Sequence, residues 1–236
     1  MLIGNSQLTA TRHARLAGAI YLLNVLTGIF ALGYVPAQTG GHGDAVATVQ
    51  NITAHEALFR AGIVAGAICY LAFLLLPLAL YRLLGATHRA AGVAMVALAA
   101  ASVPISFVTL SHKLDVLTLL GHAAWLQPLS AAQIQTQVML QLDAYGNGLL
   151  LAQVFWGLWL LPFGYLVIRG RQLPRLLGYL LVLGGLAYVV DFAAQLLLPG
   201  YSDTAFASYV TTPAALGEIG TCLWLLIVGA RPPATA

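Results

Sequence analysis

The sequence contains very little charge. Only 7% of its 236 residues are Asp, Glu, Lys or Arg and 60% are hydrophobic, whereas roughly a quarter of a soluble domain is charged. So few charges cannot cover a surface that faces water, and an integral membrane protein with the lipid bilayer as its partner is predicted. The net charge of +3 does not come from the clustered Lys and Arg that nucleic-acid binding requires, so a nucleic-acid partner is excluded.

Cysteine and catalytic motifs are equally scarce. Cys69 and Cys222 both lie in apolar runs, where a small buried side chain is the expected role, and no CxxC pair is present. The sequence also lacks the G-x-S-x-G motif of serine hydrolases and the HExxH motif of zinc proteases. The missing motifs argue against an enzyme, and no cofactor is predicted.

Long apolar runs dominate the sequence instead. A bilayer core about 30 Å thick needs about 20 helical residues, because each adds about 1.5 Å. Six runs meet this length without the alternation that barrel strands would show: 15–35, 58–82, 90–112, 144–168, 176–198 and 213–230. The predicted fold is therefore all-α, a six-helix transmembrane bundle that forms a single integral membrane domain over residues 1–236. The first run is too long for a signal peptide and is interpreted as a retained helix.

The basic residues predict an orientation. Eight of the ten fall at alternate ends of the runs: Arg12, Arg15, Arg82, Arg89, Arg169, Arg171, Arg175 and Arg231. Short loops rich in Lys and Arg stay on the cytoplasmic side of a membrane. Both termini are therefore predicted to be cytoplasmic.

Three local patterns predict where helices begin. Thr53-Ala-His-Glu56 and Ser130-Ala-Ala-Gln133 have the spacing of a capping box, so the second and fourth helices are expected to start before the membrane. Thr212 followed by Pro213 indicates an N-cap with proline at the first helical position. The glycine-rich residues 40–44 are predicted to form a loop.

Short motifs in both halves of the chain carry a family resemblance. They include Arg15-Leu-Ala-Gly18, Phe59-Arg60, Ala79-Leu-Tyr-Arg82, Asp143-Ala-Tyr-Gly146, Leu173-Pro-Arg-Leu-Leu-Gly178, Tyr188-x-x-Asp191 and Gly217-Glu218. Together they resemble the bacterial membrane family catalogued as domain of unknown function 4386, over nearly the whole chain. The resemblance implies six spans and a multi-pass protein of the bacterial inner membrane. It implies no activity, cofactor or catalytic residue.

Ionisable residues at membrane depth are the candidate functional residues, because a charge near the bilayer centre costs about 2.5–3.5 kcal/mol. Counting the helical rise from Leu176 places Asp191 about 22 Å into the membrane, and Glu218 lies at a similar depth. The complete candidate polar cluster, placed in the outer half of the bundle, comprises Arg60, His112, Lys113, Asp115, Asp143, Asn147, Tyr188, Asp191 and Glu218.

Helical spacing groups some polar residues on common faces. One face of the third run carries Ser102, Ser106, Thr109 and Lys113. This stripe either lines a water-filled cavity or packs against a neighbour while its hydroxyls bond their own helix. Tyr188, Asp191 and Gln195 share a second face. Glu56 and Arg60 have the i,i+4 spacing of a local ion pair.

The two deep acids are expected to find partners inside the bundle. An unpaired carboxylate in low dielectric seeks a cation or a proton. We therefore predict that Asp191 or Glu218 lies within hydrogen-bonding reach of Arg60 or Lys113, or of a histidine or tyrosine such as His112 or Tyr188.

Three functions are compatible with this pattern. The first is a binding or transport protein for a small molecule or ion, with the polar cluster as its site. The second is an interaction subunit of a membrane complex or of a homo-oligomer. The third is an intramembrane enzyme in which zinc is held by histidines, although their spacing does not favour it; the candidates are His42, His55, His112 and His122.

Overall fold

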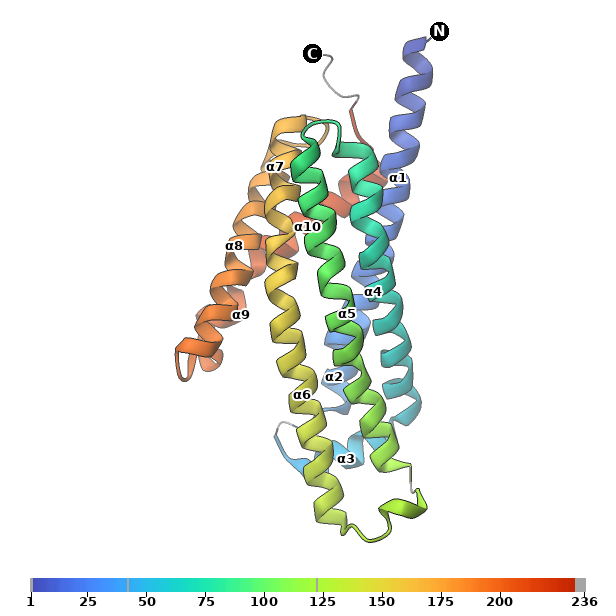
Figure 1. The fold of residues 1–236 in the computed structure, drawn as a ribbon, viewed down its shortest axis with the longest axis vertical. Coiled ribbons are helices and arrows are strands. Elements are labelled where there is room, and N and C mark those ends of the chain that lie inside the picture. Colours follow the sequence, from blue (N-terminus) through green and yellow to red (C-terminus); the bar gives the residue numbers. More distant parts are fainter. Residues whose placement is uncertain (1, 42, 122, 232–236) are drawn as a thin grey trace. The chain divides into compact units, whose positions relative to one another are not determined.

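The computed structural model describes residues 2–41, 43–121 and 123–231, and this part of the chain contains helices but no strand (Figure 1). Six helical runs are long and apolar enough to cross a membrane: Ala10–Thr39, Glu56–Leu84, Arg89–Leu120, Ala131–Gly170, Arg175–Leu197 and Ala205–Ile227. The predictions of an all-α fold and of six spans are confirmed.

Several of the runs contain more than one helix. The first contains most of α1 (Leu2–Gly28), the π-helical segment η1 (Ile29–Tyr34) and α2 (Val35–Thr39). It is followed by α3 (Ala45–Ala54), α4 (Glu56–Leu84), α5 (Arg89–Leu120) and the 3₁₀ turn η2 (Ala124–Leu126). The fourth run contains α6 (Ala131–Leu158) and α7 (Leu160–Gly170). The chain continues with α8 (Arg175–Leu197), the turn η3 (Tyr201–Asp203), α9 (Ala205–Tyr209) and α10 (Thr212–Ile227).

One of the predicted capping boxes forms. The Ser130 backbone N–H donates to the Gln133 side-chain oxygen at 2.7 Å, and the Gln133 backbone N–H donates to the Ser130 hydroxyl at 3.3 Å. These reciprocal bonds satisfy two amides that no preceding helical turn could reach. The predicted start of α6 is confirmed.

The other two predicted helix starts are wrong in detail. Thr53 lies inside α3 and donates its hydroxyl to the Val49 carbonyl at 2.8 Å, so it caps no helix. The separate helix α3 begins instead at Asp44, whose carboxylate accepts from the Val46 and Ala47 amides. The N-cap of α10 is Thr211, one residue earlier than expected, and it makes no side-chain cap bond.

The chain divides into two compact units. Unit 1 comprises Met1–Leu23, Ala72–Val103 and Leu151–Ala236, and unit 2 comprises Asn24–Leu71 and Pro104–Leu150. Because long helices pass from one unit into the other, each unit is built mainly from parts of helices.

Unit 1 is packed through glycine. A Cβ on Gly157 would lie 2.8 Å from the Gly185 carbonyl oxygen, and one on Gly185 would lie 2.7 Å from the Gly157 oxygen. Gly164 and Gly178 form a second reciprocal pair, with corresponding distances of 2.6 and 2.8 Å. Helices in lipid gain most of their attraction from such close approach of small residues. These two glycine pairs hold the fourth run against α8.

Unit 2 is also packed through small residues. A Cβ on Gly62 would lie 2.9 Å from a Val35 methyl group, and Gly148 faces the Thr109 side chain. The Asn24 side-chain amide donates to the Cys69 carbonyl at 3.0 Å, which adds a polar link between α1 and α4.

The predicted stripe on α5 lies inside the protein. Ser102, Ser106, Thr109 and Lys113 are all at most 3% exposed. The Ser102 hydroxyl donates to the Ala99 carbonyl of its own helix at 2.8 Å. The packing interpretation therefore accounts for Ser102 and for Thr109, while Lys113 has different surroundings.

Candidate functional site

Unit 2 contains a pocket of about 790 Å³. Its wall is formed by α3, the first turns of α4, the end of α5, η2 and the start of α6. Most lining side chains are apolar, and a few are polar or charged; they include Ile52, Arg60, Leu117, Leu126, Ile134 and Gln135. This volume and this mixture of groups are typical of small-molecule sites, which usually occupy about 300–1,000 Å³.

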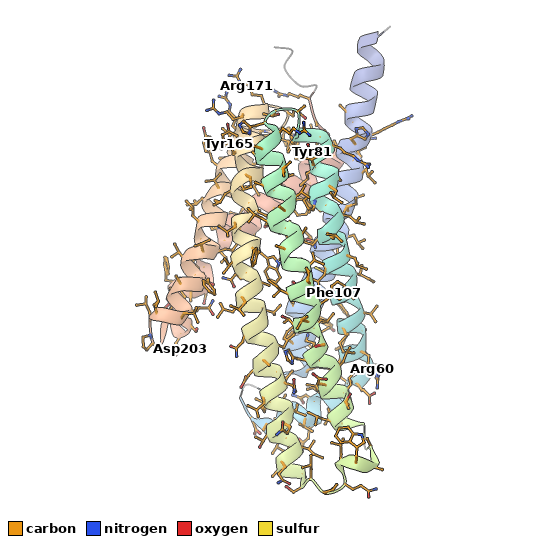
Figure 2. All side chains as sticks on the ribbon, viewed as in Figure 1. Arg60, Tyr81, Phe107, Tyr165, Arg171 and Asp203 are labelled. Carbon is orange, nitrogen blue, oxygen red and sulfur yellow. The ribbon has the colours of Figure 1, made fainter. Side chains whose placement is uncertain are left out.

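An ion pair lies at the wall of this pocket. The Arg60 Nε donates to the Glu56 Oε1 at 2.7 Å, and the two side chains are 59% and 51% exposed. The predicted i,i+4 pair is confirmed, and Figure 2 shows Arg60 on the outer surface of α4. An exposed pair of this kind contributes only about 0.3–0.5 kcal/mol to stability. Its main effect is to neutralise Arg60 locally.

Lys113 is the most unusual residue of unit 2. It is the only lysine in the sequence and is 3% exposed. Its Nζ lies 4.2 Å from the centroid of the Tyr145 ring and 5.8 Å from that of Phe59. Within residues 2–41, 43–121 and 123–231, this ammonium group has no carboxylate or other hydrogen-bond acceptor as a partner. A buried cation is thus held by aromatic faces alone.

His112, the neighbour of Lys113, takes part in a separate polar contact. Its Nδ1 lies 2.7 Å from the Gln141 Oε1 and 3.8 Å from the Asp115 Oδ2. Because the amide oxygen is an acceptor, the Nδ1 must carry the proton in this arrangement. Asp115, Asp143 and Asn147 are exposed.

Among the described acidic residues of unit 1, Asp191 accepts the most hydrogen bonds. It is 5% exposed and accepts three hydrogen bonds: from Gln153 Nε2 at 2.6 Å, Gln195 Nε2 at 2.7 Å and the Tyr201 hydroxyl at 2.9 Å. Burial and this carboxylate raise the pKa of the Tyr201 phenol, so the phenol remains a donor. Spacing on α8 identified Gln195, whereas Gln153 and Tyr201 were missed. The only available signal for Gln153 was an amide within an apolar run.

Glu218 lies among tyrosines. Tyr21 on α1 and Tyr188 on α8 are both close enough to interact electrostatically with its carboxyl group. Tyr21 is fully buried, and its hydroxyl makes no hydrogen bond of ordinary geometry with any described residue. The second deep acid therefore has tyrosine neighbours on two helices.

Family membership follows from the whole sequence. The family described as Domain of unknown function (DUF4386) matches residues 16–229. The chain belongs to this family. No curated protein and no solved structure matches it. The match confirms the resemblance carried by the short motifs.

The candidate cluster of this DUF4386 chain is divided between the units. Unit 2 contains Arg60, His112, Lys113, Asp115, Asp143 and Asn147, and unit 1 contains Tyr188, Asp191 and Glu218. The three hydrogen bonds of Asp191 come from neutral side chains, not from Arg60 or Lys113. A tyrosine does bind Asp191, but it is Tyr201 and not Tyr188.

The histidines form no metal centre in the described part of the DUF4386 chain. There, no three His, Cys, Asp or Glu side chains come together as ligands would. His42 and His122, two of the four histidines considered for zinc, lie outside the described residues.

Proposed function

We propose that this DUF4386 membrane protein binds a small solute in the pocket of unit 2, as part of a binding or transport function. The observation that carries the proposal is the pocket itself, about 790 Å³ in volume and formed by five helical segments. Its apolar wall would exclude water from a bound solute, and its few polar groups would orient it.

Closing the pocket should abolish binding. Ile134 lines the pocket on α6, so Ile134→Trp would fill part of it. We expect at least one class in a panel of small carboxylates, phosphates, amines and sugars to raise the melting temperature of the native protein by several degrees. The Ile134→Trp protein should lose that response.

Leu140→Trp is the matched control. Leu140 lies on the same helix and is 54% exposed, and it does not line the pocket. Its replacement should leave the response intact. A panel without any effect, or an Ile134→Trp protein that responds like the native one, would count against the proposed function.

We infer a bacterial inner membrane with both termini on the cytoplasmic side. All eight arginines that predict this orientation belong to unit 1, and Figure 2 shows Arg171 near the same end of that unit as Tyr81 and Tyr165.

Cysteine labelling of intact cells tests the orientation. Cys69 and Cys222 are buried and should stay silent. A membrane-impermeant maleimide should label cysteine at the exposed positions Gln127 or Ser202, but not at the exposed turn residue Ala86. Labelling of Ala86→Cys from outside would show that the protein has the opposite orientation.

A further inference from the structure

The ammonium group of Lys113 has no anionic partner among the described residues. The side chain is almost completely buried, and burial removes most of the water that would solvate an ammonium group. Cation–π contacts with Tyr145 and Phe59 replace only part of that hydration.

The aromatic ring beside Lys113 has a second polar neighbour in the same interior. Tyr70 is 3% exposed, and its hydroxyl lies close enough to the Tyr145 hydroxyl for the two groups to interact. Buried polar groups of native proteins are nearly always hydrogen-bonded. Unit 2 therefore holds the Lys113 ammonium group over the ring of Tyr145, whose hydroxyl interacts with Tyr70 and not with Lys113.

The pocket lies close to Lys113 along the chain. Leu117 lines the pocket and follows Lys113 by one turn of α5, a rise of about 6 Å. On α4, the pocket residue Arg60 is adjacent to Phe59, one of the two rings beside the ammonium group. Arg60 is already neutralised by Glu56, so Lys113 is the basic group that retains an unmet need for an anion.

We propose that Lys113 is the binding group for an oxyanion, so that the ligand of unit 2 carries a carboxylate or a phosphate. This inference rests on the proposed function, because it names the chemical class of the solute that the pocket admits. The same oxyanion chemistry occurs in small soluble acids and in the phosphate of a lipid headgroup. The ammonium group pairs with the anion, and the Tyr145 and Phe59 rings hold the ammonium in position.

The first experiment measures affinity in a non-ionic maltoside detergent, whose head group carries no oxyanion. The probes are benzoate, inorganic phosphate and, as the uncharged analogue of benzoate, benzamide. Loss of one partner from a buried charge pair commonly costs 2 kcal/mol or more, so Lys113→Met should weaken anion binding by at least about 30-fold. The matched variant Arg82→Gln removes an exposed basic group of α4 that does not line the pocket and should change affinity less than about threefold.

The second experiment uses the native protein and does not depend on a variant that folds. Lys113 carries the only side-chain amine of the sequence, so an acetylating reagent can modify just this side chain and the amino terminus. Benzoate or phosphate should slow acetylation of Lys113 at least several-fold, and benzamide should not. Phosphatidylglycerol nanodiscs and maltoside micelles, both without added anion, distinguish the sources, because protection in the nanodiscs alone identifies the phosphate of a headgroup.

The outcomes separate the two proposals. If neutral solutes bind and Ile134→Trp abolishes that binding, while no anion in solution or in lipid protects Lys113, the pocket function stands and the oxyanion assignment fails. Native affinity of Lys113→Met for benzoate or phosphate would also overturn the assignment. If anions protect Lys113 but Ile134→Trp leaves their binding unchanged, the assignment holds and the pocket is not its site.

Discussion

Lys113→Met is expected to raise the stability of the protein in the absence of ligand. An ammonium group buried without an anionic partner costs several kcal/mol, and cation–π contacts return only about 2 kcal/mol. Methionine has a similar length, and its sulfur can pack against the same rings for about 0.3–1.5 kcal/mol. The free energy of unfolding in mixed micelles should therefore increase by about 1–2 kcal/mol.

The control for this substitution is the neighbouring residue of α5. Leu114 is 51% exposed, and Leu114→Met should leave the free energy of unfolding nearly unchanged. Addition of benzoate should stabilise the native protein and not the Lys113→Met variant. A marked loss of stability in Lys113→Met would mean that the amine is well paired in the folded protein, contrary to the structure.

Substitution of Asp191 is expected to lower the stability of the protein. Asp191→Ala leaves three donors without their acceptor, and two of them, on the half-buried Gln153 and the buried Tyr201, are shielded from water. Each unsatisfied buried donor costs about 1–3 kcal/mol, so the variant should lose about 2–4 kcal/mol of unfolding free energy. Unfolding in mixed micelles at one pH measures this loss.

Two milder substitutions separate hydrogen bonding from charge. Asp191→Asn can direct its oxygen to the two glutamine amides and donate its own amide to the Tyr201 oxygen, so it should cost less than about 1 kcal/mol. Tyr201→Phe removes one bond and should cost about 1–2 kcal/mol. Asp191→Asn as unstable as Asp191→Ala would show that the negative charge, and not the hydrogen bonds, stabilises unit 1.

The spans could be predicted because lipid imposes a simple requirement on the chain. Every backbone group must be bonded within the helix and every run must match the bilayer thickness, so length and composition suffice. Helix starts are harder. Thr53 and Ser130 have the same local pattern, but Asp44 already begins α3, and that helix extends past Thr53.

The candidate site could be predicted only where its contacts are local. Glu56 with Arg60 and Asp191 with Gln195 are both four residues apart, and helical geometry dictates that such residues meet. Gln153 is 38 residues from Asp191. The rings beside Lys113 come from α4 and α6, and spacing along α5 carries no information about them. Tertiary packing determines those neighbours.

The glycine pairs of unit 1 have a consequence for the order of folding. In each pair the partners come from consecutive helical runs, and the glycines of each run are separated by seven positions. Contacts between segments so near in the chain require closure of only a short loop, which costs little entropy and favours early formation. A slip of one residue would bring a side chain against backbone at both crossings at once. The hairpin of the fourth run and α8 can therefore close early in the bilayer and in one register. It then forms a template onto which α10 packs through Gly184.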